Sequence, residues 1–105
     1  MAGQELRKIV TWQEGFSDRG FGTRIEFEGP GWGVERYEIF PESERSILEM
    51  GLDVVSKHRL NYINWVVLMV KAARKQRTSQ MVGVPIEATF EKGMLKSWRI
   101  LEEVL

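Results

Sequence analysis

The glycine-rich stretch EGFSDRGFGTR, residues 14–24, is the first segment whose composition could support chemistry. A phosphate-binding P-loop needs a glycine, four residues, a second glycine, a lysine that reaches the phosphates and a Ser or Thr that holds magnesium. Gly15 and Gly20 have this spacing, but Phe21 and Gly22 stand at the Lys and Ser/Thr positions. We also expect a strand rather than a helix to follow, so no helix N-terminus would help to bind an anion. The spacing therefore favours a connection between two strands, with Phe16 or Phe21 folded onto the core.

Part of the same stretch also bears on RNA binding. The quartet RGFG, residues 19–22, resembles the start of the aromatic RNA-binding motif of RNA-recognition domains and of the related box of cold-shock domains, with Trp12 upstream adding to the cold-shock likeness. The resemblance ends there, because Thr23, Arg24 and Glu26 stand where further aromatic or aliphatic residues belong. A long helical centre also contradicts an all-β barrel. We assign no family.

The residues that commonly perform catalysis do not form a complete set. His58 is the only histidine and the chain has no cysteine, so histidine clusters, thiolate metal sites and thiol catalysis are excluded. Acidic pairs such as Glu26 with Glu28 are expected on the solvent face of a strand. The sequence predicts no catalytic site, no metal and no cofactor, and we expect a protein that is not an enzyme.

Positive charge gathers in one part of the chain although the formal net charge is zero. Between Asp53 and Glu87 there are no acids, and the six bases are Lys57, Arg59, Lys71, Arg74, Lys75 and Arg77. The last four would form a basic edge at the end of a helix. Such an edge suits a nucleotide, a nucleic acid or an acidic protein surface, or it merely complements the helix dipole. Overall neutrality argues against a dedicated duplex-DNA binder.

The four tryptophans divide into two groups. Trp32 lies in the turn sequence GPGWG, where it either anchors a partner's surface or folds back over the core. The others are expected in the core, and they are Trp12, Trp65 and Trp98.

Alternation of apolar and polar residues predicts five strands. Three precede the central helical region, at residues 7–12, 23–29 and 34–40. Two more form a hairpin at residues 82–91 and 94–101. Pro85 cannot donate to a strand ladder, so the strand that contains it is expected at a sheet edge or with an irregularity at the proline.

The central region predicts a helix that is either long or broken. It would begin near Ser43 as a cap and run to about Arg77, with a break in which Asn61 caps a second helix. The break is expected because Arg59 would otherwise lie in the middle of the apolar stripe that contains Tyr62 and Ile63. The run INWVVLMV, residues 63–70, is apolar nearly all the way round. We therefore expect it to be buried on most sides, and the chain to form a homodimer.

Together these features predict a single α+β domain over residues 1–105, in the order βββ-α(α)-ββ. The longest apolar run has six residues and the N-terminus lacks a signal peptide, so we expect a cytoplasmic protein outside the membrane. The favoured function is an interaction protein that occupies a partner's surface, such as an adaptor, an assembly subunit or an inhibitor. The alternative is an anionic-ligand or nucleic-acid binder, and its residues would be Arg19, Phe21, Arg24, Trp32, Lys71, Arg74, Lys75 and Arg77.

Overall fold

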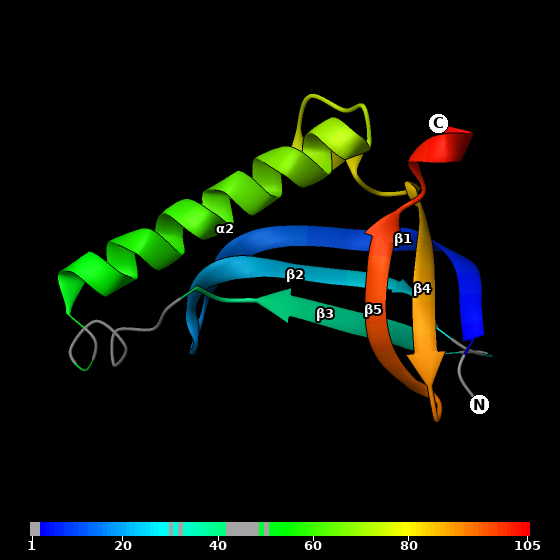
Figure 1. Ribbon diagram of the computed structural model, residues 1–105, viewed down its shortest axis with the longest axis horizontal. Helices are drawn as coiled ribbons and strands as arrows, with labels where there is room; N and C mark the ends of the chain where they lie inside the picture. The colour runs from blue at the N-terminus through cyan, green and yellow to red at the C-terminus, as the bar shows by residue number, and fades with distance from the viewer. Residues whose placement is uncertain (1–2, 30, 32, 42–48, 50) are drawn as a thin grey trace.

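The computed structural model describes residues 3–29, 31, 33–41, 49 and 51–105 (Figure 1). Its strands are β1 (Gly3–Ser17), β2 (Gly20–Glu28), β3 (Val34–Ile39), β4 (Pro85–Glu91) and β5 (Met94–Ile100). Helix α2 (Leu52–Ala72) follows β3, and the short 3₁₀ helices are η1 (Thr78–Gln80) and η2 (Glu102–Val104). The strands form one antiparallel sheet in the order β3-β2-β1-β4-β5, so the predicted α+β fold is confirmed.

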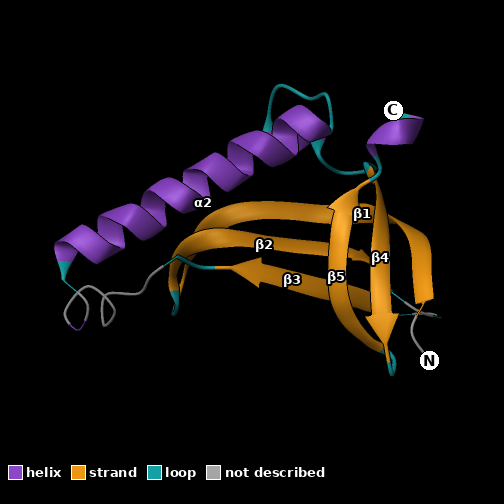
Figure 2. Ribbon diagram, viewed as in Figure 1, coloured by secondary structure: helices purple, strands orange, loops and turns teal. Residues whose placement is uncertain are grey.

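The sheet bends sharply because β1 changes partners along its length. Residues Gly3 to Lys8 pair with β4, and residues Ile9 to Ser17 pair with β2. The register shifts between Ile9 and Thr11, where one extra residue forms a bulge that increases the local twist. Strands β4 and β5 consequently cross the direction of β1, β2 and β3 (Figure 2).

The bend brings the two edge strands together through their aromatic side chains. The ring of Trp98 on β5 lies 5.4 Å from that of Tyr37 on β3 and 5.7 Å from that of Phe27 on β2, measured between centroids. Helix α2 covers the same inner face of the sheet (Figure 1), where Trp65 stacks on Trp12 at 5.8 Å. Trp12 is buried, whereas Trp65 and Trp98 are half-buried against the core, as the sequence predicted for all three.

A buried hydrogen bond fixes the middle of α2 on the sheet. The hydroxyls of Tyr62 and Thr23 lie 2.5 Å apart, and both residues are buried. Burial raises the pKa of Tyr62, and the hydrogen bond to Thr23 opposes that shift. The neutral phenol is therefore the form that this site selects.

The helix differs from its prediction in three respects. It begins at Leu52 rather than near Ser43, because Gly51 has a φ of 83° that an α-helix cannot contain. It is continuous from Leu52 to Ala72, so Asn61 is an exposed interior residue and caps nothing. It also ends before Arg77, because Arg74 adopts a left-handed conformation with φ of 58° that an α-helix cannot contain. The predicted cap Ser43 lies outside the described residues.

The hairpin near the C-terminus is confirmed, but its predicted edge position is wrong. Strand β4 lies inside the sheet, between β1 and β5. Pro85 is tolerated there as the first residue of the strand, and the irregularity falls between Thr89 and Phe90 instead. The turn uses Lys92 and Gly93, which both have positive φ, as a two-residue hairpin turn requires.

Within the described part of the chain, no helix has both the length and the apolar character needed to cross a bilayer.

Candidate functional site

Helix α2 has one face on the sheet and an opposite face that is apolar but uncovered. Val55 and Tyr62 are buried on the inner side, two turns apart. The outer side carries four aliphatic residues that are 48–65% exposed, namely Leu60, Ile63, Val67 and Leu68. We call these four residues the outer face of α2. The run that contains three of them was predicted to be buried on most sides, but the sheet covers only one side of the helix.

The charges around the outer face of α2 are mainly basic. Lys57 lies one turn before Leu60, and Lys71 lies one turn after Val67, so both project from the same side of the helix. Asp53, in the first turn, is the acid on this side. The described part of this surface is therefore an apolar stripe with a lysine near each end, interrupted by the exposed Asn64 between Leu60 and Leu68.

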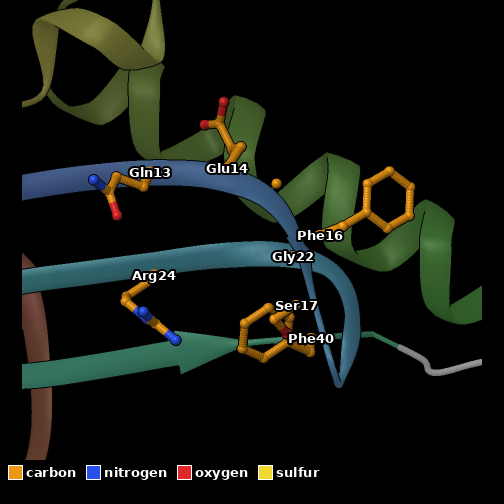
Figure 3. Close-up of a pocket in the computed structure, with 8 residues that line it drawn as sticks. Gln13, Glu14, Phe16, Ser17, Gly22, Arg24 and Phe40 are labelled. Carbon is orange, nitrogen blue, oxygen red and sulfur yellow. The ribbon is translucent and has the colours of Figure 1, made fainter.

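A second feature lies on the opposite surface of the sheet, at the end formed by β1 and β2 (Figure 3). It is a recess of about 340 Å³, lined by Gln13, Glu14, Gly15, Phe16, Ser17, Gly22, Arg24 and Phe40. Strand pairing places Gln13 opposite Arg24 and Gly15 opposite Gly22. Because residues of one parity share a face, these four lie together on the outer surface of the sheet, away from α2.

The recess lies beside a group of arginines. Glu38 on β3 forms ion pairs with Arg19 and Arg24, each at 3.4 Å. Arg36 lies 3.9 Å from Glu38 and 3.6 Å from Glu26, so three guanidinium groups surround two carboxylates. Nε of Arg24 is buried and lies within ion-pair distance of Glu38, but the geometry makes no hydrogen bond with any described residue. This cluster carries a surplus of one positive charge.

Glu14 lies on the other face of β1, the one that faces α2. Its carboxylate accepts hydrogen bonds from Trp12 Nε1 at 2.6 Å and from Thr78 Oγ1 at 3.0 Å. Figure 3 shows Glu14 and Phe16 on the α2 side of β1, directed away from Arg24. Glu14 therefore ties η1 to the sheet and leaves Arg24 as the charged side chain aimed at the recess.

The structure brings two of the predicted ligand residues, Arg19 and Arg24, together and places Phe21 on the other face of the sheet. Arg19 and Arg24 share Glu38, as described above. Phe21 is 42% exposed on the inner face, where its ring contacts those of Phe16 and Tyr62. The sequence predicted that Phe16 or Phe21 folds onto the core; Phe16 is 86% exposed, so Phe21 is the one that lies on the inner face. Trp32 lies outside the described residues.

The predicted basic edge does not form a single face. Lys71 is in the last turn of α2 and borders a groove of about 560 Å³ between α2 and β5. Arg74 turns away in its left-handed conformation and donates a hydrogen bond to the carbonyl of Leu105 at 2.8 Å. Lys75 and Arg77 are exposed in the connection that leads to η1. The helix ends too early for these four bases to align.

Arg99, one of the charged residues that line the groove beside Lys71, already has partners. Arg99 binds Glu87 at 3.1 Å and Glu103 at 2.8 Å. Hydrogen bonds from Arg99 lower the pKa of Glu103 to about 2. These ion pairs hold β4, β5 and η2 together. Arg99 therefore explains the lowered pKa of Glu103, and no ligand is needed to account for it.

Sequence reasoning missed the residues that matter most in both surfaces. The exposed aliphatic residues of α2 follow a three-four spacing that was assigned to the core, and Gly15, Gln13 and Phe40 were not selected. Among the described residues, no group of three or more His, Cys, Asp or Glu side chains could hold a metal ion.

Comparison with protein-family models, with curated proteins and with solved structures finds no match to this chain.

Proposed function

We propose that this chain is a non-enzymatic, cytoplasmic interaction protein that binds another protein through the outer face of α2. The observation that carries the proposal is the row of four half-exposed aliphatic side chains on one side of a helix. Contiguous exposed apolar surface favours binding, because covering it releases about 25 cal/mol for each Å² removed from water. The chain would act as an adaptor, an assembly subunit or an inhibitor.

The spacing and charges of this surface define the partner. Leu60, Ile63 and Val67 are separated by three and four residues, which is the pattern that packs against a second helix. Lys57 and Lys71 near the ends of the stripe favour acidic residues that flank the partner's apolar seam. The partner is therefore an amphipathic helix with acidic flanks.

A second copy of the chain fits this surface less well. In the antiparallel register that places Ile63 opposite Val67 of the other copy, Lys71 faces Arg59. The register that pairs Lys71 with Asp53 instead places Val67 opposite Lys57. Neither of these two registers satisfies both apolar contact and charge pairing, so we expect the homodimer predicted from the sequence to be the weaker assembly.

Changing Ile63 and Val67 together to glutamine should weaken partner binding by about 100-fold. Each substitution removes roughly 1.5 kcal/mol of apolar burial, while glutamine preserves helix propensity. The measurement is co-purification with quantitative mass spectrometry, followed by titration of the purified partner. The matched control changes His58 to glutamine, since His58 is exposed on α2 and projects from the other side of the helix from Ile63 and Val67. A partner retained equally by both variants would contradict the proposal.

The salt dependence of binding should distinguish an acidic partner helix from a second copy of this chain. Binding to an acidic helix should weaken several-fold as salt rises from low to physiological levels, because opposite charges are screened. Self-association should strengthen under the same change, because the screened charges are alike. Light scattering across micromolar concentrations at both salt levels measures the second effect. A dimer that is tight at low salt and loosens as salt rises would contradict the charge argument.

A further inference from the structure

Gly15 has no role in the fold that requires a glycine. Glycine inside a strand reduces stability, and it commonly marks a bulge or the close approach of a ligand. The backbone at Gly15 is not in the left-handed region, and a Cβ atom built there meets no atom of the described residues within 4 Å. Its cross-strand partner Gly22 differs, because a Cβ there would collide with the carbonyl of Ile39 and the ring of Phe40. The fold thus explains Gly22 and leaves Gly15 unexplained.

The open space above Gly15 is the recess shown in Figure 3. Its volume of about 340 Å³ lies at the lower end of the range for small-ligand pockets, which is roughly 300–1,000 Å³. A side chain at position 15 would occupy this space. Because Gly15 has no side chain, the recess stays open, and the strand is less stable than it would be with another residue at this position.

The walls of the recess offer three different interactions. Phe40 provides a flat ring against which a second ring can stack. Arg24 provides a guanidinium group that suits phosphate oxygens, within a cluster that has one surplus positive charge. Gln13, directly opposite Arg24 in the strand pairing, provides an amide that both donates and accepts hydrogen bonds.

We infer that the recess over Gly15 binds a nucleotide, with the base against Phe40, the phosphate on Arg24 and a polar edge of the base on Gln13. A free mononucleotide and one unit of a single-stranded nucleic acid present the same chemistry. The site lies on the surface of the sheet that faces away from α2. It is therefore independent of the protein-binding surface proposed above.

Titration calorimetry of the full chain tests this inference with named probes. The probes are the four ribonucleoside monophosphates, a short thymidine oligonucleotide and inorganic phosphate. We expect at least one nucleotide probe to bind the unchanged protein, and binding of the oligonucleotide alone would identify single strands as the source. Gly15→Val should abolish that binding, because the new side chain fills the recess while its backbone conformation suits a strand. Phe40→Leu should weaken it roughly tenfold through the loss of stacking.

Gly3→Val is the matched control. Gly3 also lies in β1 and pairs with Phe90 at the far end of the strand, and a Cβ atom built on it also meets no described atom within 4 Å. This variant should bind the nucleotide probe as the unchanged protein does. Three results would overturn the inference: no binding of any nucleotide probe, equal binding of inorganic phosphate, or binding that survives Gly15→Val.

Discussion

Replacing Phe27 by alanine should lower the free energy of unfolding by about 4 kcal/mol, within the usual range for a buried phenylalanine. Phe27 is fully buried, and its ring lies 5.7 Å from that of Trp98. Because Phe27 belongs to β2 and Trp98 to β5, the substitution removes a contact that exists only when the sheet is bent. Urea unfolding followed by tryptophan fluorescence measures the loss of stability.

Leu6→Ala provides the control for this measurement. Leu6 is in β1 but is 67% exposed, so its truncation should change stability by less than about 0.5 kcal/mol. A similar small effect for Phe27→Ala would show that the inner face of the sheet is not the core.

The strands were predictable because alternation directly reports which face is buried. Ile25 and Phe27 on β2, and Ile86, Ala88 and Phe90 on β4, are buried as their spacing indicated. The length of β1 was underestimated, because the sequence predicts a strand only over residues 7–12. The observed strand extends to Gly3 and Ser17 through pairing with two different neighbours, and such pairing leaves no local pattern.

The continuity of α2 was harder to predict because the helix is apolar on two sides. The predicted stripe combined Tyr62 with Ile63 and therefore placed Arg59 inside it. In the structure Tyr62 is buried and Ile63 is 56% exposed, so the inner stripe is rotated and Arg59 lies on an exposed part of the helix. Periodicity identifies apolar stripes, but it does not indicate which stripe the sheet will cover.

The candidate recess could be predicted only in part. Arg19 and Arg24 were selected for their charge, and they do meet at Glu38. The remaining wall depends on the register that sets Gly15 beside Gly22 and on the position of Phe40 after β3. Register and edge contacts between distant segments follow from the bend of the sheet, and no short sequence motif encodes them.

Replacing Gly22 by alanine should lower the free energy of unfolding by about 3 kcal/mol, at the upper end of what overpacking usually costs. The added methyl would lie inside van der Waals contact of the Ile39 carbonyl and 2.9 Å from the Cα of Phe40. Two of these obstacles are backbone, so β3 would have to move away from β2. Chemical denaturation measures the loss, and amide hydrogen exchange should show that β3 loses protection first.

Gly15→Ala makes the comparison decisive, because Gly15 is the cross-strand partner of Gly22. Its new methyl meets no described atom within 4 Å, and the smaller entropy of the unfolded chain should raise stability by about 0.5 kcal/mol. The two adjacent substitutions are thus expected to have opposite signs. Equal destabilisation by both would mean that Gly15 serves the fold after all, and the reason for assigning a ligand to the space above it would be lost.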